Sequence, residues 1–434
     1  MVVQHNMQAA NANRMLNVTT SAQSKSTEKL SSGYRINRAA DDAAGLTISE
    51  KMRKQIKGLD RASTNAEDGV SAVQTAEGAL TEVHSMLQRM NELATQSANG
   101  TNSNTDRKAI QDEIDQLTTE IDRVSETTKF NETYLLKGDG AEKAHNVNAH
   151  DAGLDGVTLT DKGDTVDVTL KTLNAGDKIS IAGKNYTIGA TTADAQKIVD
   201  AQKVDGKTVT VNGTTYTYKT NQWTNADGSA ATVGGGAAGS ITIKGGDVVS
   251  DGTKTLTAMK DGANAAGADG IDDNDSTVIT AGKAYQLQTA EIVKASSIGT
   301  DTAAAVKNGA NADKDATTTF TLTKGAVSYK DALSFNLHVG ADADMTNKIT
   351  VNIDSMNSAG LGVKGIKADT EQDATYAIDA IADAISTVSS QRSSLGAVQN
   401  RLEHTINNLD NVVENTTSAE SRIRDTDMAE EMVN

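Results

Sequence analysis

The sequence predicts an α+β protein in which a long antiparallel helical coiled-coil rod, formed by both chain ends, carries a β-rich outer region. Three observations lead to this prediction. Apolar residues with coiled-coil spacing occupy both ends of the chain. The middle alternates apolar and polar residues around Gly-containing turns, as β-hairpins do. Proline is absent from all 434 residues, so no proline kinks a helix.

Composition limits what the chain can bury and bind. Only 3% of residues are aromatic and 37% are hydrophobic, which suits paired helices and small β-layers better than one large core. Cysteine is absent, so no disulfide holds the fold. The net charge of −17 argues against nucleic acid as a partner, because phosphate binding needs a basic surface.

The N-terminal part is expected to be helical. Residues 1–45 are expected to form a helix and a connecting turn, and residues 46–138 the first part of the rod. The rod seam alternates steps of three and four along Val73, Ala76, Leu80, Val83, Leu87, Met90 and Ala94. A second helix continues the rule along Ile110, Ile114, Leu117, Ile121 and Val124. A turn at residues 97–104 separates the two helices, and Asn104 or Thr105 is the expected N-cap of the second.

The middle of the chain, residues 139–370, is expected to form a β-rich outer region, with two subdomains. Hairpins are expected at residues 178–188 and 208–218, where Gly-containing turns interrupt the alternation. Residues 252–275 are weakly patterned and expected to be loop. Further strands are expected at Ser240–Lys244, Thr317–Thr323, Leu333–Val339 and Lys348–Ile353.

The C-terminal part, residues 371–434, is expected to complete the rod. A helix from Asp373 to Glu420 would be about 70 Å long and cannot close on a core of its own. We therefore expect it to pack against the N-terminal helices. Its seam runs along Ile378, Ile381, Ile385, Val388, Arg392, Leu395, Val398, Leu402, Ile406, Leu409 and Val413.

Both ends carry motifs that closely resemble those of bacterial flagellins. The N-terminal motifs are Lys29–Asn37, Ala40–Leu46, Asn65–Gly69, Gln74–Leu80, Leu87–Ala94 and Phe130-Asn131. The C-terminal motifs are Leu395–Arg401 and Ala419–Asp427. The resemblance covers roughly residues 1–138 and 371–434, with a looser match at Gly340–Gly362, whereas the rest of the middle matches nothing that we can name.

The resemblance implies a structural subunit that assembles with copies of itself into the extracellular filament of the bacterial flagellum. It also implies partners in the flagellar export machinery and its chaperone, and export without a cleaved signal peptide. In this family the extreme N- and C-terminal helices pair as an inner tube. The sequence reaches Asn434 about where that last helix is expected to begin.

The resemblance further implies recognition by the flagellin-sensing Toll-like receptor. The family's receptor-binding ridge corresponds here to Gln88, Arg89, Glu92, Leu93, Gln96, Ile110 and Glu113. Arg89, Glu92, Leu93 and Gln96 share one helix face because they lie at i, i+3, i+4 and i+7. Arg89 is the expected hot spot. An ordinary solvated helix face is the alternative reading of these residues.

The turn after the first helix is the other candidate site. Arg35 and Arg38 lie close in sequence to Asp41 and Asp42, which suggests ion pairs between subunits during self-assembly. A local salt-bridged turn within one chain accounts for the same residues equally well.

Neither catalysis nor a metal or cofactor site is expected. The zinc-protease pattern His-Glu-x-x-His, a cysteine nucleophile and a phosphate-binding glycine loop are absent. His145 and His150 have a poor metal spacing, and the acidic run Asp269–Asp275 lacks the glycine and distal glutamate of an EF-hand. No stretch is long and apolar enough to cross a membrane. Two other functions stay open: a flagellar hook-filament junction protein, and an adhesin carried on the variable region.

Overall fold

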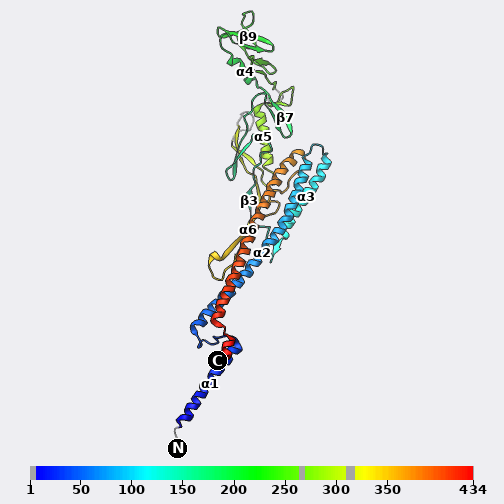
Figure 1. The fold of residues 1–434 in the computed structure, drawn as a ribbon. Coiled ribbons are helices and arrows are strands. Elements are labelled where there is room, and N and C mark those ends of the chain that lie inside the picture. Colours follow the sequence, from blue (N-terminus) through cyan, green and yellow to red (C-terminus); the bar gives the residue numbers. More distant parts are fainter. Residues whose placement is uncertain (1–5, 263–268, 309–317, 434) are drawn as a thin grey trace.

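The computed structural model describes residues 6–262, 269–308 and 318–433, and the fold is elongated (Figure 1). Helices from both ends of the chain form a rod, and α1 extends from one end of it. Most of the β-rich middle of the chain lies beyond the other end (Figure 1). The predicted α+β class, a helical rod with an inserted β-rich region, is confirmed.

Two helices of similar length, α2 (Ala43–Ser97) and α6 (Glu371–Arg424), make up most of the rod. They run antiparallel, because contacts pair the start of one with the end of the other. Ser49 Oγ donates to Glu420 Oε1 over 2.7 Å, and Arg392 lies 3.7 Å from Glu77. At 54 residues, α6 extends about 80 Å. It is therefore longer at both ends than the predicted helix.

Capping side chains set where the rod helices begin. Asp42 accepts from the N–H of Gly45 and so caps α2, while Thr370 caps α6 through the N–H of Asp373. The third rod helix, α3 (Asn104–Thr127), begins at a capping box in which Ser103 and Asp106 bond each other's backbone N–H. The predicted caps, Asn104 and Thr105, are wrong because the Ser103 hydroxyl already holds the first turn.

The predicted seam is fully buried on α2, whereas the seams of α3 and α6 contain both buried and half-buried residues. All seven residues of the α2 seam, from Val73 to Ala94, have 0% exposure. They share one core with α3 and α6 residues such as Ile114, Ile121 and Leu395. Leu402 packs lower down the rod against Ala66 and Ile349. The two distant ends of the chain therefore meet as one bundle, as the apolar periodicity predicts.

The inserted region contains short strands and two helices, α4 (Thr192–Ala201) and α5 (Ala281–Ala295). The strands are β1 Lys129–Phe130, β2 Thr133–Tyr134, β3 Asp139–Asn146, β4 Thr158–Asp161, β5 Thr165–Thr169, β6 Lys178–Ile181, β7 Lys184–Ile188, β8 Thr208–Val211, β9 Thr214–Lys219, β10 Gln222–Thr224, β11 Thr232–Val233, β12 Ser240–Ile241, β13 Val248–Ser250, β14 Thr255–Thr257, β15 Val278–Ile279, β16 Ala305–Asn308, β17 Thr319–Thr323, β18 Ala326–Asp331, β19 Leu333–His338 and β20 Lys348–Ile353.

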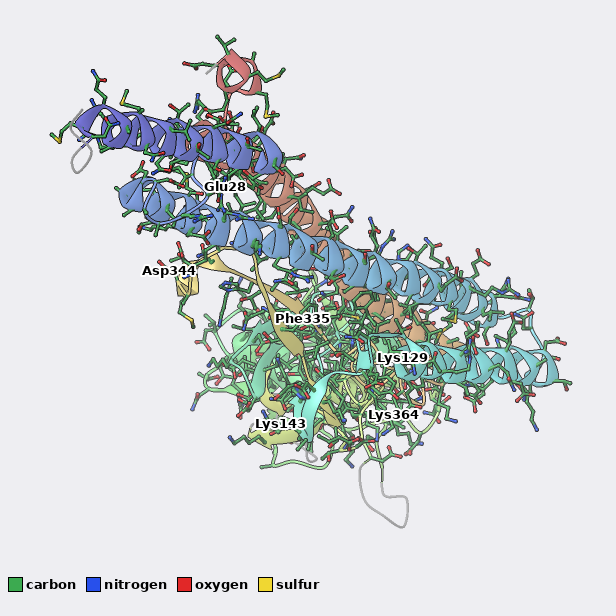
Figure 2. All side chains as sticks on the ribbon, turned by 90° about the horizontal axis from the view of Figure 1, so that it is seen from below. Glu28, Lys129, Lys143, Phe335, Asp344 and Lys364 are labelled. Atoms are coloured by element: carbon green, nitrogen blue, oxygen red, sulfur yellow. The ribbon has the colours of Figure 1, made fainter. Side chains whose placement is uncertain are left out.

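Two cores beyond the rod organise these strands. The farther core surrounds Trp223 and holds α4 against the five-stranded sheet β10-β9-β8-β13-β14. The nearer core surrounds Phe320 and joins α5 to the sheets β16-β17-β5-β4 and β15-β7-β6. The remaining pairs are β1-β2, β11-β12, β18-β3 and β19-β20. The β19–β20 hairpin lies along the rod, with Phe335 on its first strand and Asp344 at its tip (Figure 2).

Both predicted hairpins form, as β6–β7 and β8–β9. Each turns on two residues with positive φ, as a type I′ turn requires. Asn212 and Gly213 have φ of 50° and 82°, and Ala182 and Gly183 have 56° and 72°. An alanine at positive φ costs about 1 kcal/mol, so the β6–β7 turn is the more strained of the two.

The sequence reading missed other parts of the inserted region. The expected loop at residues 252–275 contains β14 and a bridge from Ile271 to Ile279, and residues 263–268 of it lie outside the described residues. The expected strand at residues 240–244 is shorter, and Thr317 also lies outside the described residues. The helices α4 and α5 were not predicted. Within the described part of the chain, no helix has the length and apolarity that crossing a membrane requires.

Candidate partner-binding surfaces

The turn between α1 (Met7–Ser32) and α2 is fastened to the end of α6. Gly33 ends α1 in the left-handed conformation, with φ of 77°. Its carbonyl accepts from Thr426 N–H, and Arg35 N–H donates to the carbonyl of Arg424 over 2.7 Å. The Arg424 guanidinium lies 4.8 Å from the centre of the Tyr34 ring. This turn therefore fixes the direction in which α1 leaves the rod.

The four charged residues of the self-assembly hypothesis all make contacts within the chain. Arg35 donates to the carbonyl of Ile423 over 2.5 Å, and Arg38 pairs with Glu28 at 3.0 Å. Asp42 is the N-cap of α2.

Asp41 accepts from the backbone N–H of Arg38 and Asn37, and Lys25 lies 3.4 Å away. The Arg38 N–H is the largest cause that lowers the pKa of Asp41. Within this chain the charges of Arg38 and Asp41 pair with residues of α1, Arg35 bonds a backbone carbonyl and Asp42 caps α2. Ion pairs between subunits at this turn stay a prediction.

The predicted receptor ridge lies where α2 and α3 run side by side. Arg89 Nε donates to Glu113 Oε1 over 2.9 Å, and Arg89 Nη1 donates to Glu92 Oε2 over 3.2 Å. Bonds to these two carboxylates, first Glu113, raise the pKa of Arg89. Gln88 and Gln96 are exposed beside them. The five side chains form one exposed polar ridge, and Arg89, with half of its side chain exposed, lies at its centre.

Two residues assigned to this ridge lie beneath it. Leu93 is 2% exposed and Ile110 is 7% exposed, and both belong to the rod core. Leu93 follows Glu92 but points inward, because i+4 from Arg89 already lies on the seam side of the helix. Ile110 is buried in the seam where its spacing places it, and Leu93 is buried beside that seam, so both support the ridge from inside. Their part in receptor binding stays a prediction.

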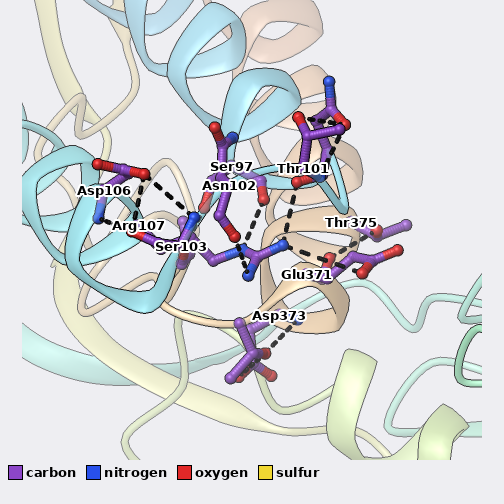
Figure 3. A network of polar contacts seen from close by, with 12 residues as sticks. Ser97, Thr101, Asn102, Ser103, Asp106, Arg107, Glu371, Asp373 and Thr375 are labelled. Atoms are coloured by element: carbon purple, nitrogen blue, oxygen red, sulfur yellow. Dashed lines mark hydrogen bonds and ion pairs between the residues drawn. The ribbon is translucent and has the colours of Figure 1, made fainter.

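A buried arginine that was not predicted holds the turn between α2 and α3 (Figure 3). Arg107 is 8% exposed and donates to three backbone carbonyls, those of Ser97, Asn99 and Asn102, over 2.9–3.0 Å. Glu371, at the start of α6, lies 3.9 Å from it. The signal was present in the sequence, because Arg107 falls three residues before Ile110 in the α3 seam, where a charge would otherwise be unpaired.

A neighbouring glutamine joins the same end of the rod to the chain that precedes α6. Gln111 is 7% exposed, and its side chain bonds the backbone of Ile366 and Ala368. Ser97 Oγ also donates to the carbonyl of Ala368. Buried polar groups that are fully bonded specify one geometry, so α2, α3 and α6 are fixed relative to one another at this end.

The motifs considered for metal binding have other partners. His145 stacks on Tyr329 with 3.9 Å between ring centres, and it lies 3.2 Å from Asp331. In the acidic run, Asp272 and Asp275 accept from nearby backbone N–H groups. Among the described residues, no group of three or more potential ligand side chains is placed to hold a metal.

One carboxylate on α6 is expected to destabilise the fold slightly at neutral pH. Partial desolvation raises the pKa of Asp379, His150 opposes this rise, and Asp151 and Asp383 add smaller increases. Because the Asp379 residue is exposed, water screens the effect and the expected change in stability is small. A folded-state pKa above the unfolded value means that stability is gained as pH falls through the folded pKa and lost above it. Asp379→Asn should therefore raise the thermal midpoint at pH 7, and the gain should disappear near pH 3.

The matched control is Glu414→Gln, which removes one charge from an exposed position of the same helix. Circular dichroism melts of both variants across pH measure the difference. Equal thermal midpoints for Asp379→Asn and the unsubstituted chain at every pH would show that the charged Asp379 carboxylate does not destabilise the fold.

An antiparallel helical rod made from both chain ends, with a β-rich insert, defines an elongated, modular type of protein. Two family models match: the bacterial flagellin N-terminal helical region over residues 3–141, and the bacterial flagellin C-terminal helical region over residues 378–434. A flagellin of Clostridium tyrobutyricum is 40% identical over 438 residues, covering all of this chain and 93% of the relative. The chain belongs to the bacterial flagellin family, a family of structural subunits of the flagellar filament.

Flagellin C of Vibrio cholerae is also similar, 35% identical over 429 residues, covering 99% of this chain and 90% of the relative. The solved structure of FliC from Burkholderia pseudomallei is 18% identical, covers 77% of this chain and 99% of that one, and has a TM-score of 0.26.

Proposed function

We propose that this chain is a subunit of the flagellar filament that assembles head to tail with copies of itself. The observation that carries the proposal is the rod: two long helices from opposite chain ends pack into one stiff antiparallel pair. A heterologous contact repeated along such a rod builds an open helix. We also propose the domain division given by the sequence, at residues 45, 138 and 370, and export without a cleaved signal peptide through the flagellar machinery and its chaperone.

The N-terminal helix supplies the second support. Residues 7–24 of α1 are exposed, among them Met7, Met15, Leu16 and Val18, each with at least 60% exposure. Within the described chain, α1 contacts α7 (Met428–Val433) only near its end, where Lys29 and Ser26 bond Glu431. Exposed apolar side chains gathered on one helix segment mark a contact surface. We propose that neighbouring subunits cover it.

Electron microscopy of the full chain after seeding with filament fragments tests the proposed function. A filament subunit gives long filaments of uniform width. Short oligomers or terminal caps would instead favour the junction-protein alternative, and the absence of any ordered assembly would contradict both.

Charge reversal at the turn provides a sharper test of assembly. Arg35→Glu should reduce filament yield several-fold, because it removes the bond to the Ile423 carbonyl and loosens the direction of α1. Arg123→Glu, at an exposed position of α3, is the matched control. Unchanged yield by sedimentation for Arg35→Glu would remove Arg35, Arg38, Asp41 and Asp42 from the assembly hypothesis.

We further propose that the ridge of Gln88, Arg89, Glu92, Gln96 and Glu113, supported by Leu93 and Ile110, binds the flagellin-sensing Toll-like receptor. The support is geometric: Glu113 and Glu92 hold the Arg89 guanidinium in one orientation on an exposed helix face. A pre-oriented arginine with a long apolar stem is a frequent hot spot.

Arg89→Ala should weaken receptor affinity by at least about tenfold, the effect of losing one central hot spot. Arg123→Ala serves as the control, since Arg123 also pairs with a glutamate three residues away on an exposed face. Surface plasmon resonance with the receptor ectodomain measures both variants. A change of about twofold or less for Arg89→Ala would refute the assignment.

A further inference from the structure

The base of α2 carries a basic stripe that has no partner within the described chain. Lys51, Lys54, Lys57 and Arg61 are exposed, and their spacing of three, three and four residues places them on one face of the helix. Across the described residues none of these four side chains forms an ion pair or a hydrogen bond, whereas Arg53 beside them pairs with Glu50. Four unpaired cations on one face are unusual in a chain with a net charge of −17.

The stripe lies beside the β19–β20 hairpin. Gly58 and Asn65 share the stripe's face of α2, and there Gly58 lies against Ala341 and Asn65 donates to the carbonyl of His338. The other side of α2 packs on α6, where Ser63 bonds Asp410. The four basic side chains stay exposed next to the hairpin, so they can contact a partner outside the chain.

The far end of the same rod has the opposite charge. From Ala62 to Ser97, α2 contains five acidic residues and one basic residue, and α3 contains seven acidic and three basic. The facing part of α6, Glu371–Leu395, adds four acidic residues and one basic. Asp68, Glu82 and Asp112 are exposed carboxylates in these segments, with no cationic partner among the described residues. The rod is thus positive at its base on α2 and negative along its upper half.

We propose that the basic stripe Lys51, Lys54, Lys57 and Arg61 docks on the acidic upper half of the rod of a second copy of this chain. Two rods in register whose α2 stripes face each other would place like charges together, whereas a rod displaced along its axis places the stripe against the carboxylates of the upper half. The charge pattern therefore selects a staggered, head-to-tail neighbour and opposes the aligned pair. This inference rests on the proposed filament function and adds the surface that sets the register.

The test is charge reversal in the full chain, with assembly seeded by filament fragments. Lys51→Glu/Lys54→Glu/Lys57→Glu should raise the critical concentration for assembly at least about tenfold at low salt, since three attractions become repulsions. The difference should shrink between about 0.05 and 0.5 M NaCl, because salt screens exposed charges. The matched control Lys178→Glu/Lys207→Glu/Lys219→Glu changes the net charge equally on exposed strands and loops of the insert, and should shift the critical concentration less than about twofold.

A compensating variant guards against a trivial loss of folding. Asp68→Lys/Glu82→Lys/Asp112→Lys should also impair assembly, and combining it with the stripe reversal should restore assembly, because the two surfaces are again complementary. Circular dichroism confirms that each variant is helical. Failure of the combined variant to recover while both parents fold would overturn the proposed pairing.

The remaining outcomes separate the inference from the function on which it rests. If the unsubstituted chain forms no filaments, the proposed function fails and this inference fails with it. If it forms filaments and the stripe variant does so equally well, only the inference fails. Loss of binding to phosphatidylglycerol vesicles by a stripe variant that still assembles normally would show that an anionic surface, and not a second copy, occupies the stripe.

Discussion

Replacing Arg107 with alanine is expected to lower the stability of the rod by about 3 kcal/mol, because three buried or half-buried backbone carbonyls lose their donor. Arg107 bonds the carbonyls of Ser97, the last residue of α2, and of Asn99 and Asn102 in the turn that follows. The Asn99 carbonyl also accepts from the Asn102 N–H over 3.2 Å. The large effect therefore comes mainly from the Ser97 and Asn102 carbonyls, which have no helical N–H to accept from, and not from the charge itself. Helical circular dichroism reports mainly on α2, α3 and α6, so the loss should appear as a fall of several degrees in the thermal midpoint.

Lys108→Ala is the control for this variant, since Lys108 is the exposed neighbour of Arg107 on α3 and makes no contact with the turn. Its midpoint should stay within about 1 °C of the unsubstituted chain. Arg107→Lys should fall between the two, because an ammonium group cannot reach three carbonyls in the fixed fork of a guanidinium. Equal midpoints for Arg107→Ala and Lys108→Ala would mean that water satisfies the carbonyls.

The rod could be predicted from sequence because its buried apolar residues recur at regular spacing. Steps of three and four from Val73 to Ala94 admit only one buried face, and that face is what the structure buries. The boundaries were less certain, because a cap depends on a single hydroxyl. Ser103 caps α3 in place of the expected Asn104 or Thr105, since only Ser103 stands three residues before Asp106.

The inserted region was harder, because its elements are short and their packing is not local. The Asn212-Gly213 turn was visible, since type I′ turns demand particular residues. By contrast, α5 is half apolar and half polar over only fifteen residues, and burial of Tyr285 and Ile292 follows from sheets distant in sequence. Its N-cap, Thr280, directly after a strand, was a usable signal that the β-rich composition around it obscured.

In the candidate sites, too, contacts set by helical spacing could be predicted, whereas contacts set by tertiary packing could not. Helical spacing placed Arg89, Glu92 and Gln96 together, and the structure adds the bond from Arg89 to Glu113 on the next helix. Spacing alone did not separate Leu93 from that face, because one residue of rotation moves a side chain from the ridge into the core. Ion-pair partners at the turn were not predictable, since Glu28 and Lys25 lie on α1 and reach the turn only through the fold.

Leu395→Ala should destabilise the rod by about 3 kcal/mol, within the range of about 2–5 kcal/mol for buried leucines. Leu395 has 0% exposure and packs in the core that α6 shares with α2 and α3. Because the same residue type occurs exposed on α1, Leu16→Ala gives a control of identical chemistry. Leu16 is 65% exposed, so its truncation should leave the thermal midpoint of the monomer almost unchanged.

Leu395→Ala should have the larger effect on the thermal midpoint, and Leu16→Ala should have the larger effect on the critical concentration for assembly. Leu395→Ala leaves every exposed side chain in place, so at a temperature where it is folded it should assemble at close to the normal critical concentration. Leu16→Ala removes one of the exposed apolar side chains of α1 that neighbouring subunits are proposed to cover, so it should raise the critical concentration although its melting is normal. Parallel losses of stability and assembly in both variants would contradict this separation. If Leu395→Ala lowers only the thermal midpoint and Leu16→Ala impairs only assembly, then burial within one chain stabilises the rod. Apolar surface left exposed on α1 would then join one chain to the next.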